Sequence, residues 1–81
     1  MVLKKDRDLA EFIGIYLGTG KIFNDRLVIS IDKERDNYVN YVSNLIKRIF
    51  EINPEKVERT YLTDLIISDK EKIRVFMAFL D

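Results

Sequence analysis

The fold of this chain is decided by one stretch near its start, Leu9-Ala10-Glu11-Phe12-Ile13-Gly14-Ile15-Tyr16-Leu17-Gly18-Thr19-Gly20. Its apolar residues recur at the spacing of one helix face, at Leu9, Phe12, Ile13, Tyr16 and Leu17. Asp8 precedes this stripe as a candidate N-cap, and Glu11 stands three residues further on, as in a capping box. We therefore predict a helix over residues 7–18.

All three glycines of the chain lie in this stretch. A glycine inside a helix costs about 1 kcal/mol relative to alanine, so Gly14 and Gly18 need a compensating role. Their spacing puts both on one helix face, where the backbone of a second helix can approach closely. The alternative is that they seat the helix against a sheet. Gly20 is expected to end the helix in the left-handed conformation.

The segment from Phe12 to Gly20, FIGIYLGTG, resembles the signature of the LAGLIDADG homing endonucleases, and the preceding Leu9-Ala10 fits its longer form. The resemblance implies that this helix pairs with its symmetry mate to form a homodimer. The implied interface residues are Phe12, Ile13, Gly14, Tyr16, Leu17 and Gly18. It also implies a metal-dependent DNA endonuclease, in which the acidic residue before the last glycine binds the catalytic divalent metal.

That acidic position is Thr19 in this sequence. A threonine hydroxyl is neutral, whereas Mg²⁺ prefers carboxylate oxygens, and two-metal cleavage of a phosphodiester needs charged ligands. We therefore predict the fold and the helix pairing without DNA cleavage, and no cofactor. Mg²⁺ would be needed only by an active nuclease. Asp25 and Asp32 are candidate replacement ligands, although a turn and an N-cap already give each a structural role.

Composition limits the other possibilities. The 81 residues carry no net charge, no cysteine and no histidine, so zinc-finger spacing and cysteine or Ser-His-Asp nucleophiles are excluded. One domain over residues 1–81 is expected. No apolar run has the length of a signal peptide or a membrane span, which predicts a cytoplasmic protein with no membrane partner. Abundant Ile, Lys and Glu, with no Gln, suit a thermophile.

The rest of the chain predicts two hairpins and two helices. Strands are expected over 21–23 and 26–31, around a turn at Asn24-Asp25, and over 56–62 and 65–68, around a turn at Thr63-Asp64. Helices are expected over 33–52, capped by Asp32, and over 69–80. This αββαββα order predicts an α+β fold with an antiparallel sheet and helices on one face. The LAGLIDADG domain has the same order of elements.

The expected register divides the sheet into two faces. The core face would hold Ile22, Leu27, Ile29, Ile31, Thr60, Leu62, Leu65 and Ile67. The open face would carry cations and aromatic rings but no acid, and in the resembling family this face reads double-stranded DNA. The candidate DNA-contacting residues are Lys21, Phe23, Arg26, Val28, Ser30, Arg59 and Tyr61.

Two features of this face leave an alternative open. Net charge is zero, and several of these side chains are apolar, so the face could instead bury against another protein or another copy. Lys47 and Arg48 are expected on a solvated helix edge, with phosphate contact as the second reading. Tyr38 and Tyr41 are expected to pack rather than to catalyse. Three hypotheses follow: an inactive DNA-binding homodimer, a metal-dependent nuclease, or a protein assembly module.

Overall fold

The computed structural model describes residues 3–80, which form three helices and a four-stranded antiparallel sheet. The elements are α1 (Arg7–Thr19), β1 (Gly20–Phe23), β2 (Arg26–Asp32), α2 (Asp36–Phe50), β3 (Glu55–Glu58), β4 (Leu62–Ile67) and α3 (Lys70–Leu80). This order confirms the predicted αββαββα layout of an α+β fold. Among residues 3–80, no helix is both long and apolar enough to cross a membrane.

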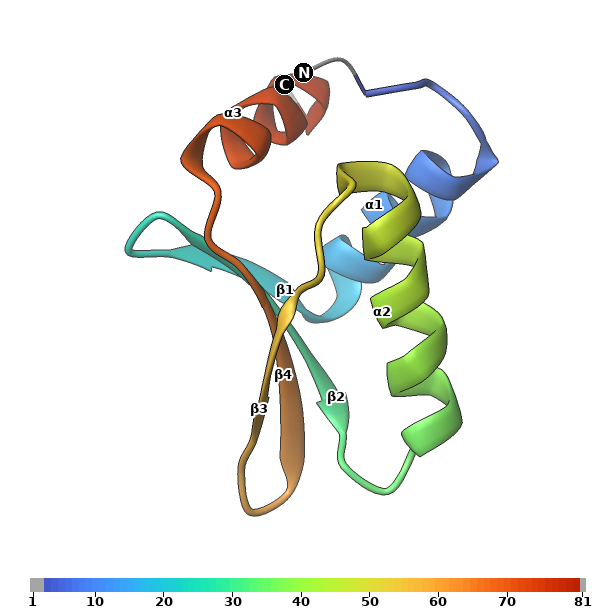
Figure 1. The fold of residues 1–81 in the computed structure, drawn as a ribbon, viewed down its shortest axis with the longest axis vertical. Helices are drawn as coiled ribbons and strands as arrows, with labels where there is room; N and C mark the ends of the chain where they lie inside the picture. The colour runs from blue at the N-terminus through green and yellow to red at the C-terminus, as the bar shows by residue number, and fades with distance from the viewer. Residues whose placement is uncertain (1–2, 81) are drawn as a thin grey trace.

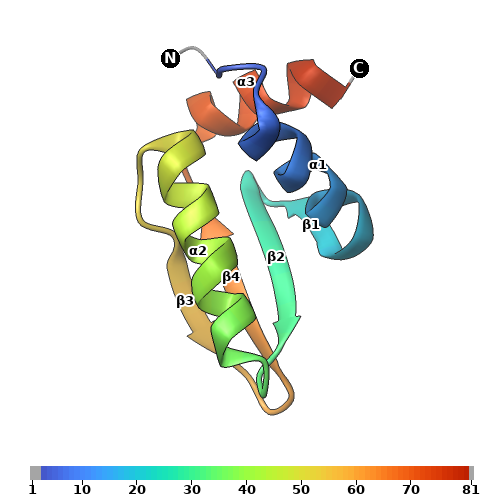
Figure 2. The same cartoon turned by 90° about the vertical axis from the view of Figure 1, so that its right-hand side faces the viewer.

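The strands lie side by side in the order β1-β2-β4-β3, and every neighbouring pair is antiparallel. Figures 1 and 2 show α2 running along the strands, while α3 lies across the end of the molecule away from the β3–β4 loop. The side chains that point toward the helices are buried on β2 and β4, namely Leu27, Ile29, Ile31, Thr63, Leu65 and Ile67. The opposite face has no helix over it in the described part of the chain (Figure 1).

One phenylalanine from each helix meets the others in the core. The ring of Phe12 on α1 lies 5.4 Å from Phe50 on α2 and 5.3 Å from Phe76 on α3, centroid to centroid. Phe50 and Phe76 lie 5.9 Å apart, and all three pairs meet edge to face, the arrangement that aromatic quadrupoles favour. All three rings are fully buried. Phe12 therefore belongs to the core of one chain and cannot line a helix-pairing surface as expected.

The helix boundaries depart from expectation at their caps. Asp6, not Asp8, is the N-cap of α1, because Asp6 Oδ1 accepts from the Leu9 amide at 3.0 Å. The 33–52 helix begins only at Asp36, since Asp32 instead accepts from the Glu34 amide within the preceding loop. Leu3 is buried in the core, so the segment that precedes α1 is held against the rest of the described chain.

Gly20 ends α1 in an extended conformation (φ −91°, ψ 159°), not in the left-handed one that was expected. Its lack of a side chain is still required. A Cβ at this position would collide with the Tyr16 ring and would lie 2.9 Å from both the Tyr16 carbonyl oxygen and Ile29 Cδ1. Gly20 therefore lets the first strand leave the helix immediately and cross close beside it.

The first hairpin is as predicted and the second is not. Asn24 and Asp25 take positive φ values of 50° and 60°, as a two-residue turn of type I′ requires. The second turn lies at residues 59–61 instead of Thr63-Asp64, and β4 begins at Leu62. Thr63 therefore points into the core, and Leu62 lies on the open face.

Candidate nucleic-acid interface

The open face of the sheet gathers most of the predicted DNA-contacting side chains. Cα partners in a ladder share a face, and the register pairs Lys21 with Val28 and Phe23 with Arg26. Val28 in turn lies opposite Ile66 on β4. Lys21 and Arg26 are exposed and flank the exposed ring of Phe23, at the end of the sheet where β1 turns into β2. We call Lys21, Phe23 and Arg26 the basic end.

Acidic side chains also lie on this face, so the expectation of an acid-free face is wrong. Asp64 pairs with Ser30 of β2 and with Val57 of β3, and the same alternation puts Asp32 and Glu55 on the open face. The sequence predicts Asp64 in a turn, Asp32 as a helix cap and Glu55 outside a strand, whereas the structure places all three in strands. The cations are thus concentrated at the basic end, while the acids lie farther along β2 and on β3 and β4.

Asp64 is the centre of a bonded group on the open face. Its Oδ1 accepts from Ser30 Oγ at 2.7 Å and from Arg59 Nη2 at 3.1 Å, and its Oδ2 lies 3.0 Å from Arg59 Nε. The side chain of Asp64 is 14% exposed, whereas that of Arg59 is 51% exposed. The carboxylate is therefore enclosed beneath a guanidinium that faces solvent. We call Ser30, Arg59 and Asp64 the arginine clamp.

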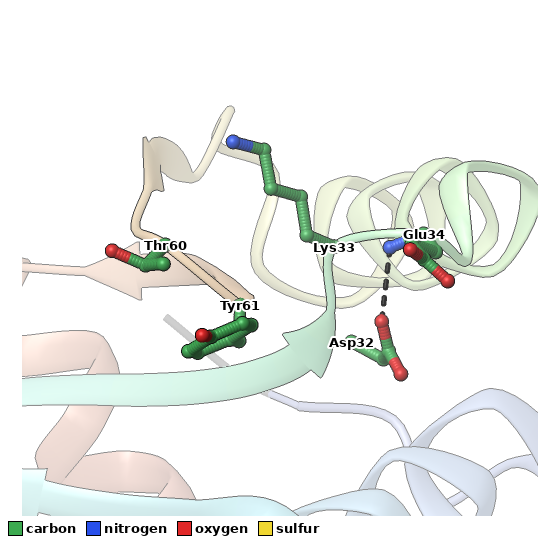
Figure 3. A pocket seen from close by; sticks show the side chains of 5 residues that line it. All are labelled: Asp32, Lys33, Glu34, Thr60 and Tyr61. Carbon is green, nitrogen blue, oxygen red and sulfur yellow. Dashed lines mark hydrogen bonds between the residues drawn. The ribbon is translucent and has the colours of Figure 1, made fainter.

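Tyr61 lies apart from this group, in the β3–β4 loop rather than on a strand. Its backbone oxygen accepts from the Lys33 amide at 3.0 Å, which ties the loop to the segment after β2. Figure 3 shows the shallow hollow that results, with Asp32 and Lys33 pointing to opposite sides of the backbone. The ring of Tyr61 is 81% exposed and is the most exposed large apolar side chain of the described residues.

The outer face of α1 carries a row of small residues that nothing in the described chain covers. Ala10, Gly14 and Gly18 recur every four residues and are all exposed. Apart from the chain neighbours and the backbone of α1 itself, no described atom lies within 4 Å of a Cβ built at Gly14 or Gly18, so these glycines do not seat the helix against the sheet. Leu17 beside them is 73% exposed. We call Ala10, Gly14, Leu17 and Gly18 the open α1 face.

The other two residues predicted to line the helix pair, Ile13 and Tyr16, pack partly against the core of their own chain. Ile13 is half-buried against the core, and the ring of Tyr16 lies 5.4 Å from Phe76, edge to face. Tyr16 therefore helps to hold α3 against α1. Both side chains are therefore only partly exposed.

The candidate metal ligands do not converge within one chain. Thr19 is exposed at the end of α1, and its hydroxyl lies 3.5 Å from the Ile15 carbonyl oxygen. Asp25 is exposed and lies 3.6 Å from Lys70 Nζ. Asp25 and Asp32 flank the two ends of β2, so a strand length on the order of 20 Å separates them. Within residues 3–80, no three acidic side chains gather as a metal site.

Polar side chains join α1 to α2 at the surface. The Tyr41 hydroxyl donates to the Glu11 carboxylate at 2.7 Å, and this hydrogen bond raises the pKa of Tyr41 above its ordinary value of 10.0. Arg48 Nε donates to Asp8 Oδ2 at 3.0 Å, and the same bond raises the pKa of Arg48. Arg48 is thus engaged by an acid of its own chain. Tyr38 packs against the core as expected, whereas Tyr41 lies exposed at the surface, with its ring stacked 6.4 Å from that of Tyr38.

The sequence missed Asp64 and the arginine clamp. One local feature of the sequence indicates the pair: Arg59 and Asp64 have opposite charges and lie on either side of Leu62, where β4 begins. The three-residue loop over 59–61 brings their side chains together. No protein-family model matches this chain, and no curated protein matches it either.

Proposed function

We propose that this protein is a homodimeric, LAGLIDADG-like DNA-binding protein that does not cleave DNA. The single observation that carries the proposal is the open α1 face. Two glycines in one helix cost about 2 kcal/mol relative to alanines, and no contact within the described chain compensates this cost. A second helix packed on that face would compensate it, because backbones without side chains can approach closely.

The geometry of the sheet supports DNA as the partner of such a dimer. The open face is free of helices in the described part of the chain (Figure 1) and carries the basic end, where an exposed ring lies between two cations. Cations of this kind contact phosphates or guanine edges, and strands fit the major groove. A two-fold dimer presents the same surface twice, so the preferred site would be an inverted repeat.

The absence of cleavage rests on Thr19. This hydroxyl occupies the position at which the resembling family has its metal-binding acid, and a neutral oxygen is a poor ligand for Mg²⁺. Under the proposed function, the protein therefore binds DNA without added metal. Magnesium-dependent nicking of supercoiled DNA that is lost in Asp25→Ala would instead identify an active nuclease.

A second candidate function is protein assembly through the open face. It is favoured by the acids Asp32, Glu55 and Asp64 and by the exposed Val57, which make this face less basic than DNA-binding surfaces usually are. An assembly module would form tetramers or larger species and would ignore DNA.

The test is analytical ultracentrifugation of the protein alone and with a pool of short duplexes, without Mg²⁺, at low and at moderate salt. The proposal expects a dimer that sediments faster with DNA at low salt and loses this shift as salt rises. A dimer that ignores DNA at every salt concentration would favour assembly. A monomer would remove the basis of the proposal.

A further inference from the structure

We propose that the arginine clamp reads a guanine, so that Arg59 is a specificity-determining residue and Asp64 its positioning residue. This inference rests on the proposed DNA-binding function and names the base that one part of the site would recognise. Asp64 holds the guanidinium of Arg59 with both carboxylate oxygens, because Oδ2 contacts Nε and Oδ1 accepts from Nη2.

This geometry fixes the orientation of the guanidinium. A carboxylate that accepts from Nε and Nη2 occupies one edge of the planar group. The Nη1 amine and the second Nη2 hydrogen remain, and together they form the end of the fork. That end is suited to paired acceptors such as O6 and N7 of guanine, the commonest specific contact that arginine makes in the major groove.

The carboxylate is itself held in place. Ser30 Oγ on β2 donates to Asp64 Oδ1 at 2.7 Å, and Asp64 belongs to β4, which pairs with β2 at this point. A long side chain normally loses rotamer freedom when it is immobilised on a ligand, and this loss weakens binding. Because Arg59 is already held by a carboxylate on a paired strand, it would lose less freedom on meeting a base edge.

Charge favours a base over a phosphate as the partner of this arginine. Arg59 and Asp64 together carry no net charge, so the pair gains little from the counterion release that drives phosphate binding. An enclosed carboxylate also repels a phosphate brought close to it. A guanine edge is neutral and is read by directed hydrogen bonds, which the ion pair leaves intact. The exposed cations of the basic end are better placed for phosphate contact.

The experiment begins with selection of binding sites by the wild-type protein from a randomised duplex pool, at low salt without Mg²⁺. Because the proposed dimer has two copies of Arg59, we expect guanines at two symmetry-related positions of the selected site. Affinity is then measured for the selected duplex and for duplexes in which one or both of the symmetric G·C pairs are replaced. The variants are Arg59→Lys, Asp64→Asn and, as a matched control, Arg26→Lys.

For Arg59→Lys we expect a loss of roughly 5- to 150-fold for each guanine that the duplex retains, and little change on the duplex in which both are replaced, since lysine keeps the charge but lacks the planar fork. Arg26→Lys should keep the guanine preference. Asp64→Asn should lose part of the preference for guanine. It should also bind all duplexes more tightly at low salt, because Arg59 is then an unpaired cation. The slope of log affinity against log salt concentration should become steeper by about one per subunit.

The outcomes separate the two proposals. An equal loss on every duplex in Arg59→Lys, or a selected site with no position that depends on Arg59, would overturn the guanine contact and leave DNA binding standing. A wild-type protein that binds no duplex at low salt would overturn the proposed function, and the inference with it. Unchanged circular dichroism and melting of each variant show that the loss is not a loss of folding.

Discussion

Replacing Gly14 by leucine is expected to stabilise the single chain and to disrupt its proposed dimer. The two effects have opposite signs, so this one substitution shows whether the exposed surface of α1 is free in solution or is paired with a second copy. Gly14 lies in the middle of α1 with a helical backbone, and apart from its chain neighbours and the backbone of α1 itself, no atom of the described chain lies within 4 Å of a Cβ built there. A leucine side chain therefore meets open space in the monomer.

The gain in the monomer follows from helix propensity. Leucine is better than glycine in a helix interior by about 0.8 kcal/mol. For a domain of this size, that gain corresponds to a melting temperature higher by about 3–7 °C. At concentrations where the wild-type protein is monomeric, the melting temperature of Gly14→Leu should therefore be higher than that of the wild type.

The cost in the dimer follows from overpacking. A side chain forced into a close-packed contact costs about 1–3 kcal/mol, and a two-fold dimer contains this position twice, giving about 2–6 kcal/mol. Even the lower value weakens dimerisation by roughly 30-fold. The wild-type melting temperature should rise with protein concentration, and that of Gly14→Leu should not.

Sedimentation velocity and thermal melts across a concentration series measure both effects. Asn40→Leu is the matched control, because it puts the same side chain on an exposed position of α2, away from the open α1 face. We expect this control to remain a dimer and to gain at most about 0.5 kcal/mol from propensity. If Gly14→Leu forms the same dimer as the wild-type protein, the open α1 face is not the pairing surface.

Three further predictions test the core, the helix end and the helix contact. Phe76→Ala should lower the free energy of unfolding by about 3–5 kcal/mol, measured by urea titration, because it opens a cavity where three helices meet; a loss below about 1 kcal/mol would contradict the packing. Thr19→Asp should lower the melting temperature without metal, since a negative charge at a helix C-terminus opposes the dipole, and Mg²⁺ should restore it in the dimer; equal melting with and without Mg²⁺ would refute this. In the wild-type protein Tyr41 should ionise at higher pH than it does in the Glu11→Gln variant, as measured by tyrosine absorbance. Because folding raises the pKa of Tyr41, the stabilisation that its hydrogen bond contributes is complete below pH 10.0 and is lost as pH rises through the folded-state pKa.

The first half of the sheet could be predicted because its turn chemistry is local. Asn24 and Asp25 both tolerate positive φ, and a two-residue loop fixes the register of every residue that follows. The faces of β1 and β2 were therefore assigned correctly, residue by residue. The helices α1, α2 and α3 were found from their apolar spacing.

The second hairpin could not be predicted in the same way. Thr63-Asp64 has the composition of a turn, but Asp64 is stabilised in a strand by Ser30, which lies 34 residues earlier in the sequence. The N-cap of α1 shows a related limit. Asp6 and Asp8 are both suitable by type, and the burial of Leu3 and the pairing of Asp8 with Arg48 are tertiary effects that choose between them.

The meeting of three phenylalanines has a consequence for the order in which this protein can form during synthesis. Phe12 emerges from the ribosome before Phe50, and Phe76, which belongs to α3, emerges after both. Until Phe76 arrives, the rings of the first two helices have an open side toward water. The growing chain would therefore hold an incomplete core, a surface for chaperones or misplaced partners, until α3 docks and closes it.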